Sequence, residues 1–198
     1  MGFAVLIDIL GSIIVGGFFL LTLLRFNENT THNSYAYNGE VIVQENLVAT
    51  IETLEYDLRK IGFCDDPLKL PQPSRSILYA DSTTIKYLTD TQVSGNLDTI
   101  IYYLGPASEL ESTPNPNDRL LYKSVNGVPK SVNLGVTEFK MRYFDALGYE
   151  LTPPLSVPTG ISSMQVDVKV ENTTAYAEDY RYAFWRQIRL ASRNIEDR

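Results

Sequence analysis

The stretch that decides the fold lies near the N-terminus, where residues 3–24 read FAVLIDILGSIIVGGFFLLTLL. As a helix, about 22 residues span about 33 Å, which is enough to cross the hydrocarbon core of a bilayer. A cleaved secretory signal needs basic residues ahead of a shorter apolar core and a small-residue cleavage site behind it. This run is longer, nothing basic precedes it, and Arg25 ends it. We therefore predict a retained, membrane-spanning helix over residues 1–26.

Four residues inside this run are unusual for a lipid-facing helix. Asp8 is costly in lipid, so it either pairs with another group or lies near the headgroups as a cap. Gly11, Gly16 and Gly17 weaken a helix and allow close backbone approach. Since Gly16 and Gly17 are adjacent, they do not form the spaced pattern of a helix-dimer face. Local bending and tight pairing both remain open.

The orientation of this helix in a membrane is not decided by charge. No Lys or Arg precedes it and Arg25 follows it, which weakly favours a cytoplasmic C-terminal part. The chain beyond is acidic, and acidic residues contribute little to topology.

A polar neck, residues 27–39, separates the apolar run from a second predicted helix over residues 40–63. The neck contains no Pro but few strong helix formers, so continuity between the two helices is open. Apolar residues in the second helix recur at steps of three and four, as in an amphipathic helix. They are Val43, Leu47, Ile51, Leu54, Leu58 and Ile61. Gly62 is a candidate C-cap, and Pro67 prevents continuation.

Residues 64–198 have the pattern of short β-strands, with β-branched and aromatic runs separated by Pro- and Asn-rich loops. About seven strands are predicted on these patterns, at residues 77–79, 84–88, 99–104, 120–123, 136–143, 164–171 and 180–190. Asn126-Gly127 is a hairpin-turn dipeptide. Strict alternation over 164–171 predicts one buried and one wet face. The fold class is α+β, a long N-terminal helix packed on an antiparallel sheet.

Composition argues against several functions. The net charge of −7 repels phosphates, so no nucleic-acid contact is predicted. With one His and one Cys, we predict no metal site, no cofactor and no enzyme activity. Cys64 is interpreted as a small buried apolar side chain. The Arg and aromatic residues of 180–193 are interpreted as Arg stems covering a sheet face.

Several segments together resemble the type IV pilins and type II secretion pseudopilins. Residues 54–63, LEYDLRKIGF, resemble the close of the long helix in PilW-type minor pilins and J-type pseudopilins. Residues 136–148, VTEFKMRYFDALG, resemble their following strand and turn, and Arg193-Asn194 their closing dipeptide. Gly2-Phe3 ahead of the apolar run resembles a prepilin processing site. Counted from Phe3, Asp8 is the sixth residue, whereas the family's acid is the fifth of the mature chain.

The resemblance implies a structural subunit of an extracytoplasmic pilus-like or pseudopilus filament. It also implies processing at Gly2-Phe3 and methylation of the new N-terminus. The implied assembly residues are Phe3, Asp8, Gly11, Gly16 and Gly17, with Asp8 the partner of a neighbouring subunit's N-terminal amine. The implied motif residues are Asp57, Leu58, Arg59, Gly62 and Phe63.

The implied partners are other pilin-like subunits, an inner-membrane assembly platform and a prepilin peptidase. The subunit waits as a single-pass inner-membrane protein and ends in a periplasmic or cell-surface filament. The alternative hypothesis is a membrane-anchored, monomeric extracytoplasmic binding module or adhesin.

Overall fold

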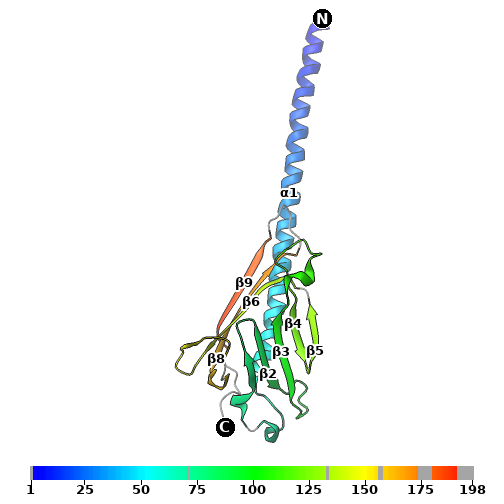
Figure 1. Ribbon diagram of the computed structural model, residues 1–198. Coiled ribbons are helices and arrows are strands. Elements are labelled where there is room, and N and C mark those ends of the chain that lie inside the picture. Colours follow the sequence, from blue (N-terminus) through cyan, green and yellow to red (C-terminus); the bar gives the residue numbers. More distant parts are fainter. Residues whose placement is uncertain (1, 71, 133, 156–157, 174–179, 191–198) are drawn as a thin grey trace. The chain divides into compact units, whose positions relative to one another are not determined.

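The computed structural model describes residues 2–70, 72–132, 134–155, 158–173 and 180–190. Its first element is one helix, α1 (Gly2–Arg59), of 58 residues. By its internal contacts the chain forms two compact units, residues 1–39 and residues 40–198, which are described separately. Figure 1 draws α1 in blue to cyan.

The question of continuity is answered by α1, because residues 27–39 are helical throughout. Their polar side chains are exposed, and the hydroxyl of Thr30 donates to the carbonyl oxygen of Phe26 at 2.9 Å. This bond satisfies the hydroxyl within the helix, so polarity alone does not interrupt it. The polar neck is therefore part of α1.

The second half of α1 is amphipathic as predicted. Six apolar side chains of the stripe are buried: Val43, Leu47, Ile51, Leu54, Leu58 and Ile61. The helix ends at Arg59, and two tight turns follow, in which the amides of Lys60 and Ile61 donate to Asp57 and Leu58. Gly62 has φ +74°, a conformation that lacks a steric penalty only for Gly. It redirects the chain toward the sheets.

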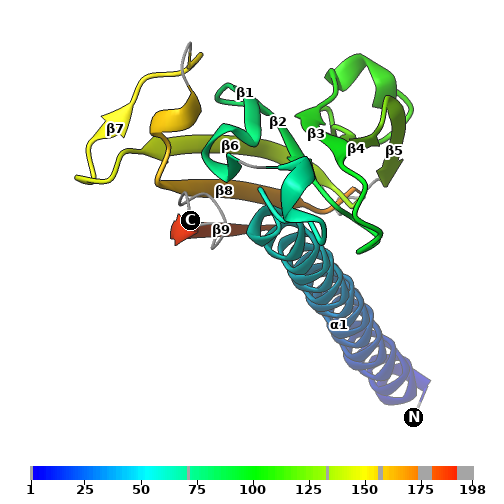
Figure 2. The same cartoon turned by 90° about the horizontal axis from the view of Figure 1, so that it is seen from below.

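Within the described residues, nine strands form two antiparallel sheets rather than the single sheet that we predicted. The first sheet has the order β1-β2-β3-β4-β5, with β1 (Ile77–Ala80), β2 (Thr84–Thr89), β3 (Asp98–Leu104), β4 (Leu121–Val125) and β5 (Val128–Val132). The second has the order β7-β6-β8-β9, with β6 (Val136–Phe144), β7 (Glu150–Leu151), β8 (Ser163–Glu171) and β9 (Tyr182–Leu190). Figure 2 shows β6, β8 and β9 side by side.

The sheets separate after β5. Gly135, with φ +72°, turns the chain so that β6 pairs with β8 and not with β5. The carbonyl oxygen of Gly135 accepts from the amide of Glu171 at 2.8 Å. The predicted hairpin between β4 and β5 is confirmed, with Asn126 and Gly127 at φ +51° and +85°.

One apolar core is built from the α1 stripe and the inward side chains of both sheets. The largest fully buried strand side chains in it are Tyr87, Ile85, Ile100, Phe139, Met141, Tyr143 and Met164. Two expectations about burial were wrong. Cys64 is half-buried, with its thiol 3.9 Å from the carbonyl oxygen of Gly95. The polar face of β8 is covered too, since Gln165 and Asp167 are buried there.

A buried carboxylate ties α1 to the first sheet. Asp57 accepts a hydrogen bond from the hydroxyl of Tyr102 on β3 and forms an ion pair with Lys123 on β4. Burial raises the pKa of the Tyr102 hydroxyl well above its usual range, and the negative charge of Asp57 raises it further. Tyr102 therefore stays protonated and remains a donor to Asp57.

We expect Asp57→Ala to lower the free energy of unfolding by about 2–3 kcal/mol, because it leaves a buried hydroxyl and a half-buried ammonium without their acceptor. Urea unfolding of the full chain in detergent, followed by the fluorescence of Trp185, measures the loss. The matched control is Glu55→Ala, which removes an exposed pair with Arg59 at 3.9 Å. That change should cost at most about 0.5 kcal/mol. Equal losses of unfolding free energy in the two variants would show that the contacts of Asp57 with Tyr102 and Lys123 do not stabilise the fold.

Candidate functional site: the exposed apolar helix

The candidate site is the first part of α1, residues 3–26. Every side chain described there is exposed. The large apolar ones have relative exposures from 52% at Ile9 to 79% at Phe3. Covering one such side chain is worth about 1.5–3 kcal/mol, so leaving the whole set in water forgoes on the order of tens of kcal/mol. The segment therefore requires a cover, either lipid or protein.

The polar side chains of this segment differ in how they are satisfied. The hydroxyl of Ser12 donates to the carbonyl oxygen of Asp8 at 2.7 Å, and that of Thr22 donates to Phe18 at 2.8 Å. Both are satisfied inside the helix. The carboxylate of Asp8 has no partner among the residues that the structure describes. Asp8 is thus a carboxylate in an apolar segment that the described part of the chain does not pair.

The three glycines have no packing role within the chain itself. A methyl group built on Gly11, Gly16 or Gly17 meets nothing within 4 Å. The helix is continuous through Gly16-Gly17. Each Gly costs a helix about 1 kcal/mol relative to Ala. No contact to these positions within the described part of the chain offsets this cost.

The motif residues lie elsewhere, at the joint between α1 and the sheets. Leu58 is in the core, and Arg59 pairs with Glu55 on the surface. The amide of Gly62 donates to Leu88 at 3.1 Å. The carbonyl oxygen of Phe63 accepts from the amide of Asp90 at 2.8 Å.

The motif residues thus have a structural part at the end of α1 and in the turn that follows it. Sequence reasoning missed the two partners of Asp57, Tyr102 and Lys123. They lie 45 and 66 residues away along the chain, and no local pattern marks such a pairing.

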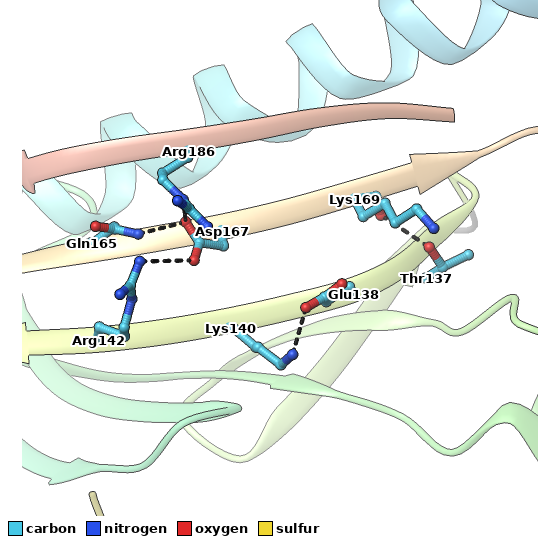
Figure 3. A network of polar contacts seen from close by, with 8 residues as sticks. All are labelled: Thr137, Glu138, Lys140, Arg142, Gln165, Asp167, Lys169 and Arg186. Carbon is cyan, nitrogen blue, oxygen red and sulfur yellow. Dashed lines mark hydrogen bonds and ion pairs between the residues drawn. The ribbon is translucent and has the colours of Figure 1, made fainter. Parts of the chain in front are cut away.

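A second polar arrangement covers the outer face of the four-stranded sheet (Figure 3). Asp167 on β8 accepts from Gln165 at 2.8 Å and pairs with Arg186 at 3.1 Å and Arg142 at 3.5 Å. Further pairs join Lys140 to Glu138 and Lys169 to Glu171, both at 2.6 Å.

Each of these cations therefore has a carboxylate on its own face. Arg186 pairs with the buried Asp167 through its guanidinium, whereas the side chains of residues 187–193 lie outside those that the structure describes. The Lys and Arg side chains named here are matched by carboxylates within the face.

Among the described residues, no three His, Cys, Asp or Glu side chains lie close enough together to hold a metal ion. Searches against family models, curated proteins and solved structures found no match. The architecture itself, a long N-terminal apolar helix packed on antiparallel sheets, is pilin-like. Its first part is long and apolar enough to cross a membrane, a property that anchors and signal sequences share.

We expect the double variant Gly16→Ala, Gly17→Ala to keep or slightly raise the stability of the isolated chain, because the added methyl groups meet open space. Circular dichroism and thermal unfolding in detergent measure this. Gly135→Ala is the contrasting control, since its methyl group would lie 2.2 Å from the carbonyl oxygen of Glu171 at a positive φ. It should destabilise by about 2 kcal/mol or more. A destabilised double variant would reveal a packing role that the structure does not contain.

Proposed function

We propose that this protein is a structural subunit of an extracytoplasmic filament of the type IV pilus or pseudopilus kind, assembled through residues 3–26 of α1. The observation that carries the proposal is the division of one unbroken helix. Its second half is buried against the subunit's own sheets, whereas its first half is fully exposed. A chain that has completed one apolar face and left the other uncovered is suited to share the second with other chains.

Before assembly, lipid covers the first half. The chain then crosses the inner membrane once, with residues 40–198 on the extracytoplasmic side. An assembly platform and a prepilin peptidase belong to this proposal as partners, through the resemblance described above. Leaving the bilayer exposes the same apolar surface again, so lateral helix contacts in the filament must replace the lipid contacts.

Gly11, Gly16 and Gly17 support this exchange, because small residues let helix backbones approach closely. Asp8 supports it in a different way. In an apolar bundle an unpaired carboxylate is costly, and a cationic partner offsets that cost only where the two groups meet. A neighbouring subunit's N-terminal amine supplies such a cation. Asp8 then fixes the register between helices.

The test compares Asp8→Ala with Ser12→Ala in cells that carry the complete assembly system. Sheared surface fibres are imaged by electron microscopy, and their subunits and N-termini are identified by mass spectrometry. Asp8→Ala should reach the membrane at normal levels and fall at least about tenfold in the fibres, since about 1.4 kcal/mol per contact already gives that factor. Ser12→Ala, which removes a hydroxyl satisfied within the helix, should assemble normally.

Wild-type amounts of Asp8→Ala in fibres would refute the register role. If purified fibres lack the chain altogether and a generic transmembrane helix replaces residues 3–24 without loss of function, the protein is the membrane-anchored monomeric module instead.

A further inference from the structure

An apolar groove of about 210 Å³ opens between the second half of α1 and the β4–β5 hairpin. Its walls are mainly aliphatic, from Leu54 on α1, Leu121 on β4, and Leu134 and Val136 beyond β5. A cavity of about 150 Å³ with such walls already accommodates a benzene-sized group. The groove therefore has room for one large apolar or aromatic side chain.

Two lysines stand on this groove. Lys123 and Lys130 are directly opposite each other on β4 and β5, an arrangement that like charges disfavour. Asp57 neutralises Lys123. Lys130 is exposed, and no carboxylate pairs with it within the part of the chain that the structure describes. The groove thus combines an apolar floor with an unmatched positive charge.

The sheet edge beside the groove is poorly suited to pair with an added β-strand. It lies by the free edge of the first sheet, and Pro129 in β5 removes a backbone donor there. An occupant must therefore dock through its side chains.

The hairpin that joins β6 to β7 carries exposed apolar side chains and a carboxylate, which are complementary to the apolar groove and its lysine. One carboxylate oxygen of Asp145 accepts from the amides of Leu147 at 2.9 Å and Tyr149 at 2.8 Å, and Gly148 has φ +85°. This bonding fixes the turn, and yet Leu147 and Tyr149 are 82% and 69% exposed. The exposed Glu150 follows directly. A rigid turn that displays a Leu and a Tyr has the features of an interface anchor.

The two features lie on opposite sides of the sheet unit, with β7 at one side and β4–β5 at the other (Figures 1 and 2). The hairpin of a chain therefore faces away from its own groove. A contact between them joins one copy to the next in a head-to-tail manner, which closes into a ring or continues as an open array.

We propose that the 145–150 hairpin of one copy docks in the lysine-bearing groove of a second copy, with Leu147 or Tyr149 in the groove and Glu150 near Lys130. Apolar shape and charge match on the two sides. The inference deepens the filament proposal by naming a contact between the sheet units of neighbouring subunits, but it does not depend on residues 3–26.

Cross-linking between two differently tagged full-length chains in detergent tests this contact. Both carry Cys64→Ser, one carries Leu147→Cys and the other Ser131→Cys, a residue that lines the groove. Mixing them with a short thiol cross-linker should give a covalent heterodimer. Leu68→Cys replaces Leu147→Cys in the control, since Leu68 is 89% exposed on a different loop. It should give at most about a tenth of the product, because docking of the hairpin does not raise the effective concentration of a thiol at residue 68 near residue 131.

Charge reversal then tests the pairing itself. Lys130→Glu on the groove chain should lower the cross-linked yield about two- to fivefold, the range of an exposed ion pair. Glu150→Lys on the hairpin chain should do the same alone and restore the yield when combined with Lys130→Glu. Tyr149→Ala should lower it about fivefold or more.

Equal cross-linking by Leu68→Cys, or a yield that ignores both charge reversals, overturns the inference and leaves Lys130 as a charge that protects a sheet edge. The two proposals fail separately. Fibres that contain the chain without the 147–131 cross-link refute only the docking contact, whereas the cross-link in a chain that never enters fibres refutes only the filament.

Discussion

The structure depends on the burial of one helix stripe against two sheets. Apolar side chains of α1 from Val43 to Leu58, with Ile61 just beyond the helix end, belong to a core that both sheets share. Within the described residues, no other α-helix covers the inner face of either sheet. A two-layer core of this kind needs the helix as much as the helix needs the sheets. The buried tie of Asp57 to Tyr102 and Lys123 adds direction, because its hydrogen bonds require one rotation of α1.

Local signals in the sequence predicted the elements well. The apolar run, the stripe of the second helix, most strands and the Asn126-Gly127 turn follow from periodicity and turn chemistry within a few residues. Periodicity and turn chemistry do not identify which strands pair with one another. Alternation in β6 shows which side chains face inward, but it does not show which strand lies beside β6. In the structure that strand is β8, and the hydrogen bond from the amide of Glu171 to the carbonyl oxygen of Gly135 lies where the pairing begins. For that reason the sequence predicts one sheet where the structure has two.

The candidate site was predictable only where a local signal marks its residues. Asp8 and the glycines stand out because they interrupt a run of apolar residues. The groove, Lys130 and the cover over Asp167 do not stand out, because each arises where distant segments meet. Cys64 shows the limit of composition, since a residue type that is usually buried is half-exposed at this loop.

Two carboxylates on one helix differ in whether the chain itself supplies their partners. Asp57 and Asp8 both lie among apolar neighbours on α1, but Asp57 has a hydroxyl and an ammonium from its own sheet, while Asp8 has no partner among the described residues. Neither charge is favourable in an apolar setting without a partner. The same helix thus pairs one carboxylate with its own sheet and leaves the other without a partner among the described residues, and the proposed contact through Asp8 rests on this contrast.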